Sequence, residues 1–176
     1  DRGFDDKNVD VVMLDLGLTG YQQPDALAFA DRLRSRVRAL PGVQAAAFAA
    51  DLPLDGNRMG LGTLRVPGLQ PPNGADSFRA DWNAVSPDYF KTLNMRLVSG
   101  RDFTEQDTSA APGVIIINEA MARSVWQTSD VLGRQFEANV IGDVKTTLTV
   151  VGIAPDAQVD TLGATARPFV YVPLAQ

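Results

Sequence analysis

The sequence contains neither cysteine nor histidine. The chain therefore has no disulfide, no Cys–His or Ser–His–Asp catalytic group, and no zinc site of the usual kind. No stretch approaches the ~20 apolar residues that a membrane-spanning helix requires. The polar opening DRGFDDK does not have the pattern of a signal peptide. Phosphate-binding loops, dinucleotide fingerprints and nucleophile-elbow motifs are also missing, so we expect no catalytic, cofactor-binding or metal-binding residue.

Positive charge is scarce as well. The chain has 16 basic and 21 acidic residues, a net charge of −5, and acidic residues outnumber basic ones in each third of the sequence. Nucleic acid requires a concentrated basic surface, so we expect no nucleic-acid partner. The length of 176 residues, with 45% hydrophobic and 21% charged residues, fits one ordinary domain or two small lobes sharing a core. Because the sequence begins with Asp1 rather than Met, we expect it to be a piece of a longer protein.

The first fifty residues predict a strand–helix–strand unit. Residues 9–16 and 43–50 are apolar runs of strand length, and a helix is expected from Pro24 to about residue 40. Its apolar stripe comprises Ala26, Phe29, Leu33, Val37 and Leu40. Four arginines fall in its second half: Arg32, Arg34, Arg36 and Arg38. They could bind an anionic partner, but a solvated helix face is the preferred interpretation.

Further strands and helices alternate along the rest of the chain. Strands are expected at 61–66, 79–85, 114–117, 135–140, 146–153 and 169–172. A short helix is predicted at 87–93 with Ser86 as N-cap, and a second one ends near Trp126 with Asn118 as N-cap. Gly133 is expected to end the preceding segment, and Gly142-Asp143 to lie in the loop between two of the strands. The mixture predicts an α/β class, mixed α+β.

Two groups of side chains are candidates for a site. Asp102, Glu105 and Asp107 lie within six residues and could bind a hard cation, although their spacing matches no calcium loop and turn or capping roles are preferred. An acid-pair hydrolase would need two carboxylates held across a cleft, and nothing marks out such a pair. The second group could line a ligand pocket, but core packing is preferred for it. Its members are Trp82, Tyr89, Phe90 and Trp126.

Several motifs resemble a known family in content and in order. They are LPGV (40–43), VSPDYFKTL (85–93), LVSGRDFTEQD (97–107), VIIINEAMAR (114–123), LGR (132–134), TVVGI (149–153) and YVPLAQ (171–176). Together they resemble the periplasmic core domain of MacB-like permeases of the ABC-transporter superfamily, over nearly the whole chain. The nearest subgroup lacks a fused ATPase.

The resemblance implies a domain inserted between the first transmembrane helix and the following three. It implies a porter-like lobe of βαβ units, residues 1–96 and 156–176, with a second small α/β lobe, residues 97–155, inserted into it. The quoted motifs would then be structural: Gly100 and Gly133 for turns, Asn118 and Ser86 for caps, and Phe90 and Phe103 for the core.

The implied function is non-catalytic. The domain would transmit ATP-driven conformational change to a substrate or partner protein outside the membrane, as the periplasmic, extracytoplasmic part of an inner-membrane protein. Its partners would be the transmembrane helices of the same permease and a separate cytoplasmic ATPase subunit. A periplasmic adaptor or outer-membrane channel, and a homodimer in the full-length protein, are further partners that the family allows. The alternative is a module that captures a peptide or amphiphile in a cleft between the lobes.

Overall fold

A computed structural model describes residues 2–16, 18, 20, 23–54, 60–61, 64–141, 144–157 and 165–176. Its helices are α1 (Gln23–Arg38), α2 (Tyr89–Thr92) and α3 (Glu119–Trp126), with a 3₁₀ turn at Pro72–Gly74. Its strands are β1 (Leu64–Arg65), β2 (Asp81–Val85), β3 (Ser99–Gly100), β4 (Val114–Asn118), β5 (Gln135–Ile141), β6 (Val144–Ala154) and β7 (Phe169–Pro173). The predicted α/β class is confirmed, and the Gly142-Asp143 loop lies outside the described residues.

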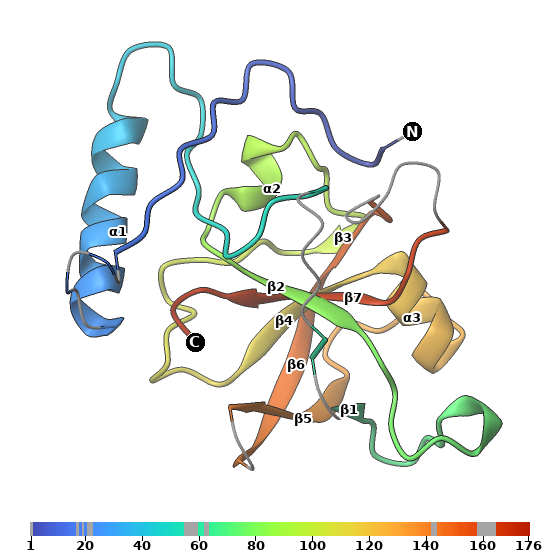
Figure 1. Cartoon of the computed structure of the whole chain (residues 1–176). Coiled ribbons are helices and arrows are strands. Elements are labelled where there is room, and N and C mark those ends of the chain that lie inside the picture. The colour runs from blue at the N-terminus through green and yellow to red at the C-terminus, as the bar shows by residue number, and fades with distance from the viewer. Residues whose placement is uncertain are drawn as a thin grey trace.

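The seven strands form one mixed sheet. The order is β1-β5-β6-β4-β7-β2, and β3 pairs with β6 beside that path. The pairs β4–β6 and β2–β7 are parallel, whereas the other pairs are antiparallel (Figure 1). Long β5 and β6 make the hairpin that the sequence predicts. Strands from both predicted lobes take part in this sheet, and the division at 97 and 155 stays a prediction.

Strand β4 lies in the middle of the sheet and all five of its residues are buried. Its side chains alternate between two apolar clusters, as the period of a strand requires. Ile115 and Ile117 belong to the first cluster, together with Met121 and Val125 of α3. Val114 and Ile116 belong to the second cluster, which contains the buried aromatic side chains of α2. Both faces of the sheet are therefore covered.

Asn118 joins three elements at the end of β4. Its side-chain oxygen accepts hydrogen bonds from the backbone N–H groups of Met121 and Phe169, each at 2.9 Å. Its amide nitrogen donates to the carbonyl of Arg167 at 2.8 Å. The first of these bonds is the N-cap of α3 that the sequence predicts. At 2% exposure Asn118 is a fully bonded buried polar residue, which fixes β4, α3 and β7 relative to one another.

Three predicted features of the first half differ from the structure. Residues 9–16 form no strand in the described part of the chain, and most of them are exposed. Ser86 does not cap α2: that helix begins at Tyr89, and the Ser86 hydroxyl instead accepts the Phe48 N–H at 2.8 Å. The predicted strand at 43–50 is reduced to a bridge between Ala49 and Val85.

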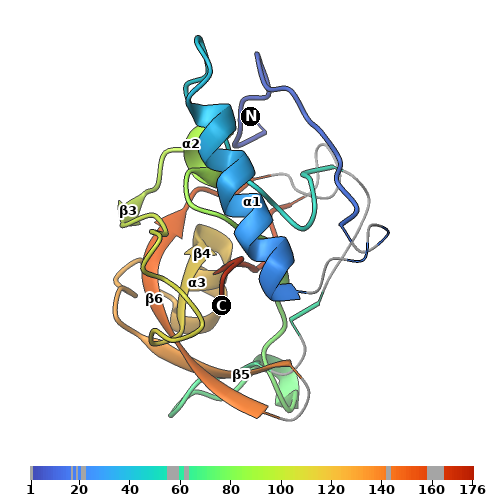
Figure 2. The ribbon, with the colours of Figure 1, turned by 90° about the vertical axis from the view of Figure 1, so that its left-hand side faces the viewer.

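Helix α1 stands outside the sheet. Figure 1 shows it at the left, beyond the N-terminal segment and the segment that follows the helix, and Figure 2 shows it facing the viewer. Neither apolar cluster contains a residue of α1. The predicted stripe is half-buried at Ala26, Phe29, Leu33 and Val37, while Leu40 beyond the helix end is exposed.

Gly100 and Gly133 have nearly equal positive φ angles, +81° and +78°, and so offer a matched pair of substitutions. A Cβ on Gly100 would lie 2.7 Å from the Cα of Gly152 in β6, whereas a Cβ on Gly133 would meet nothing within 4 Å. We predict that Gly133→Ala costs about 1–2 kcal/mol of unfolding free energy, the penalty of the left-handed backbone. Gly100→Ala should cost a further ~1–3 kcal/mol because it crowds β6. Urea unfolding of both variants measures the difference, and equal losses would show that the β3–β6 approach is not tight.

Candidate functional site

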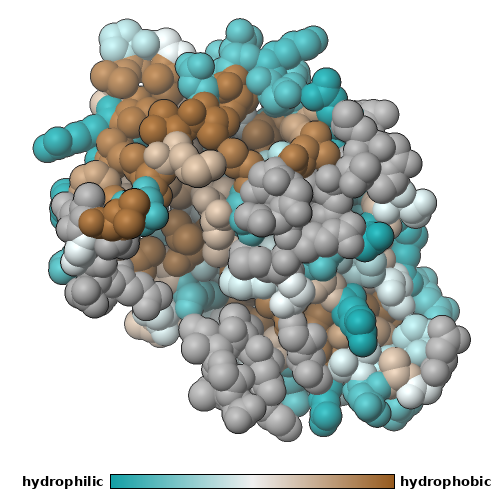
Figure 3. Space-filling view, in the orientation of Figure 1, coloured by the Kyte–Doolittle hydropathy of each residue, from teal (hydrophilic) through white to brown (hydrophobic). Residues whose placement is uncertain are grey.

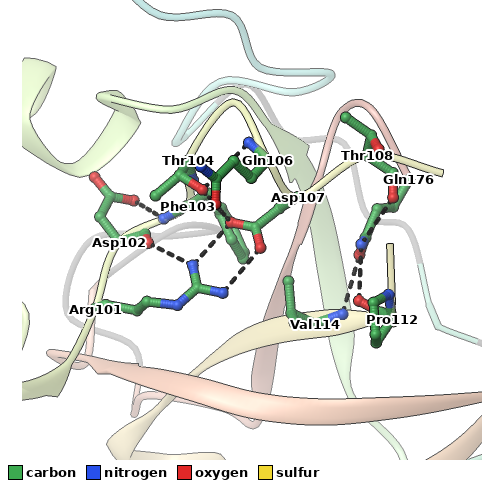
Figure 4. Close-up of polar contacts among 10 residues, drawn as sticks. All are labelled: Arg101, Asp102, Phe103, Thr104, Gln106, Asp107, Thr108, Pro112, Val114 and Gln176. Atoms are coloured by element: carbon green, nitrogen blue, oxygen red, sulfur yellow. Dashed lines mark hydrogen bonds and ion pairs between the residues drawn. The ribbon is translucent and has the colours of Figure 1, made fainter. Parts of the chain in front are cut away.

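The three acids of the predicted cluster are engaged by protein groups. Asp107 is buried and accepts two hydrogen bonds from the guanidinium of Arg101, both at 2.8 Å (Figure 4). It also accepts the backbone N–H of Thr104 at 2.8 Å and the Thr104 hydroxyl at 3.2 Å. Asp102 accepts the N–H of Phe103 at 2.7 Å, and Glu105 forms an ion pair with Arg34. The preferred turn role is confirmed for Asp107, which bonds to Thr104 across the turn.

This loop also receives the last residue of the chain. The side-chain oxygen of Gln176 accepts the N–H of Val114 at 3.0 Å, and its nitrogen donates to the carbonyls of Thr108 and Pro112 (Figure 4). The segment between β3 and β4 is therefore tied at one end by Arg101–Asp107 and at the other by Gln176. Within the described part of the chain, no group of three or more Asp or Glu side chains could hold a metal ion.

The two acids beside Arg101 have opposite electrostatic environments. The hydrogen bonds from Arg101, with those from Thr104, hold the pKa of Asp107 below its ordinary value. Burial raises the pKa of Asp102, against a smaller opposing effect of its hydrogen bond from Phe103. Ionised Asp107 therefore stabilises the fold, whereas ionisation of Asp102 opposes it.

Arg34 contradicts the interpretation of the arginines as a solvated face. It is 4% exposed, and its guanidinium lies against the carboxylates of Asp88 and Glu105. Arg38 joins the same group through Asp88 at 3.1 Å, whereas Arg32 and Arg36 are exposed as predicted. Arg34 follows buried Ala30 by four residues, so the two side chains share the inner side of the helix.

The aromatic group packs as core, as predicted. Tyr89 and Phe90 contact each other edge to face with ring centroids 5.5 Å apart, and Phe90 meets Tyr171 of β7 at 4.9 Å. Burial raises the pKa of the Tyr89 and Tyr171 hydroxyls, so both stay neutral. Trp82 and Trp126 are partly buried against the first apolar cluster.

An exposed apolar run is a surface feature that the sequence does not predict, because residues 9–16 are predicted to form a strand. Val12 and Met13 are 78% and 89% exposed, and Val11, Leu14 and Leu18 are exposed beside them. Figure 3 shows hydrophobic side chains gathered at the upper left, over α1 and its flanking segments. None of the described helices is long and apolar enough to cross a bilayer.

A family model described as the MacB-like periplasmic core domain matches residues 4–176. The chain belongs to this family. Its members are extracytoplasmic domains of MacB-like ABC transporter permeases, so the resemblance drawn from the sequence motifs is confirmed.

Two curated proteins show the same relationship. The macrolide export ATP-binding/permease protein MacB 1/2 of Paracoccus denitrificans (strain Pd 1222) is 30% identical over 145 residues, which are 82% of this chain and 20% of that protein. The uncharacterized ABC transporter permease YvrN of Bacillus subtilis (strain 168) is 30% identical over 92 residues, 51% of this chain and 21% of that protein. This MacB-like chain therefore spans about a fifth of the length of these relatives.

Solved structures agree on the fold. The periplasmic region of MacB from Actinobacillus actinomycetemcomitans superposes with a TM-score of 0.53 at 18% identity, covering 85% of this chain and 55% of that one. The extracellular domain of the noncanonic ABC-type transporter YknZ from Gram-positive bacteria gives 0.51 at 18% identity, covering 83% and 63%.

Substitution of the two acids tests their opposite environments. At neutral pH, Asp107→Asn should lose about 1.5–3 kcal/mol of unfolding free energy, the range for hydrogen bonds to charged groups. Because the folded-state pKa is lowered, this stabilisation is present above the ordinary carboxyl pKa and disappears as the pH falls through the folded value. The difference in unfolding free energy between the variant and wild type should therefore begin to shrink below about pH 4.

The matched control, Asp102→Asn, keeps an acceptor for the Phe103 N–H and removes a charge whose burial is unfavourable. It should be slightly more stable than wild type at pH 7, with the gain shrinking as acid protonates wild-type Asp102. Urea unfolding between pH 3 and pH 7 measures both effects. Equal losses in the two variants would contradict the assignment.

Proposed function

We propose that this MacB-like domain is a non-catalytic transmission module. It takes up conformational change generated by ATP hydrolysis in a separate cytoplasmic subunit and passes it to a substrate or partner protein outside the membrane. The family match over residues 4–176 carries this proposal, because members of this family are parts of ABC permeases. A periplasmic location, on the outer side of an inner membrane, belongs to the same proposal, as do an adaptor or outer-membrane channel and a dimeric full-length permease.

The packing of the domain supports transmission. A rigid body passes on displacement only if its elements move together, which requires paired strands and discrete, well-packed contacts. β4 is buried and paired along both edges, and Asn118 ties it to α3 and β7. We also propose that residues 97–155, which contain β3 to β6 and α3, form the inserted lobe.

The chemistry of the described side chains supports the absence of catalysis. The acids of the 102–107 cluster accept hydrogen bonds from Arg101, Thr104 and Phe103, or pair with Arg34, which are structural contacts. The tyrosines with raised pKa values lie in the second apolar cluster.

A single cysteine label tests transmission, since the domain has no cysteine of its own. Ser124 lies on the exposed face of α3, so Ser124→Cys can carry an environment-sensitive fluorophore in the full-length permease once any cysteine outside this domain is replaced. With its ATPase subunit in a bilayer, we expect ATP to change the label's emission, and an ATPase variant unable to hydrolyse ATP to abolish repeated cycling.

The isolated 176-residue chain is the control for catalysis, and we expect it to release no phosphate from ATP. Unchanged emission in the full-length complex would contradict transmission, and ATP turnover by the isolated chain would contradict the non-catalytic role. A saturable thermal shift of the isolated chain with peptides or amphiphiles would instead favour the ligand-capture alternative.

A further inference from the structure

Helix α1 belongs to a segment that is fastened to the sheet body at its two ends. At the first end, the N–H of Asp5 donates to the carbonyl of Leu93 at 2.9 Å. At the second, the N–H of Phe48 donates to the Ser86 hydroxyl and the N–H of Ala50 to the carbonyl of Ala84. Phe4, Ala47 and Ala49 pack against the second apolar cluster. The described residues from 9 to 43 belong to neither apolar cluster. The part of the chain between the attachments at Asp5 and Phe48, which contains α1, therefore lies outside the sheet body and is called the excursion below.

Charged groups fix the middle of this excursion. Nη1 of Arg34 lies 3.8 Å from Oδ2 of Asp88 and donates to the Pro87 carbonyl at 3.4 Å, and Nη2 pairs with Glu105. Arg38 reaches the same Asp88 oxygen at 3.1 Å. Asp88 and Glu105 come from two different places in the body: the turn before α2 and the loop after β3. Asp88 has a φ of +69°, a left-handed backbone conformation.

The chemistry of this contact suits repeated opening. An apolar interface loses free energy in proportion to the surface it exposes, but a buried guanidinium and its carboxylates regain hydration when they separate. Desolvation of the Arg34 guanidinium offsets part of its attraction to these carboxylates while the group is docked. Nε of Arg34 is buried and has no hydrogen-bond acceptor among the described residues. This unpaired donor further reduces the free-energy difference that favours docked α1 over released α1.

We propose that Arg34, Asp88, Glu105 and Arg38 form a latch with two positions. When it is closed, α1 is held against the body. When it is open, α1 moves away from the body, the attachments at Asp5 and Phe48 are kept, and the sheet is unchanged. The ion pairs set where α1 docks more than they stabilise the fold. The device is a property of this chain alone and does not depend on the proposed transport function.

Distance measurement between two spin labels tests the latch in the 176-residue chain. Ser35→Cys on the exposed side of α1 and Ser124→Cys on α3 place one label on each side of the junction, with no native cysteine to interfere. We expect one narrow distance distribution for the labelled parent. Arg34→Met, which keeps an apolar stem but removes the charge, should raise the displaced population at least about tenfold.

Arg36→Met is the matched control. It removes one positive charge from the same helix, two residues away, at an exposed position that has no ion pair with any described residue. It should leave the distribution as in the parent. If the two methionine variants give the same distribution, the latch does not exist, and the same holds if the parent distribution is already broad.

A variant of the acidic side keeps the test decisive if Arg34→Met unfolds, as judged by its circular-dichroism melt. Asp88→Asn with Glu105→Gln leaves Arg34 in place and removes both partners, and asparagine tolerates the left-handed backbone at position 88. This double variant should release α1 to a similar extent with the sheet intact. An unchanged distance distribution in it would overturn the proposal.

Discussion

Strand β4 is the constraint on which the rest of this domain depends. All five of its residues are buried, so its backbone groups need partners on both edges and its side chains need cover on both faces. Parallel β6 supplies one edge and antiparallel β7 the other. α3 covers one face and the aromatic cluster of α2 the other. Asn118 ends the strand by satisfying backbone groups of α3 and of the chain entering β7, which makes these elements one body.

Helix α1 is attached by a different kind of force. The sheet body is held by apolar burial and backbone ladders, which act over many residues and separate only on unfolding. The apolar stripe of α1 is only half-buried. The buried guanidinium of Arg34 on this helix pairs with the carboxylates of Asp88 and Glu105. The transmission proposed for this domain would use both kinds of contact. The rigid body would carry the motion, and the proposed polar latch would let α1 take a second position without loss of the fold.

The sequence predicts the structure best where a strong local pattern coincides with burial of the same residues in the fold. The apolar run of β4, the Asn118 cap and the β5–β6 hairpin each combine strong local signals with burial, and all were predicted. The strand at 9–16 failed because a strand exists only with a neighbour, and propensity does not reveal whether one is present. The predictions of Ser86 as an N-cap and of Arg34 on a solvated face were wrong for a related reason. Their side chains serve Phe48 and Glu105, which are 38 and 71 residues distant in the sequence, and no local rule detects such partners.

Native-state hydrogen exchange of the 176-residue chain tests most directly whether the sheet body and α1 are separable. A released 16-residue helix is marginal in water, so the amides of α1 should exchange through a local opening of low free energy. The amides of β4 should exchange only with global unfolding, and added urea should lower their protection far more steeply. If α1 and β4 instead show equal protection and equal urea dependence, the domain opens as a single unit and this account of it is wrong.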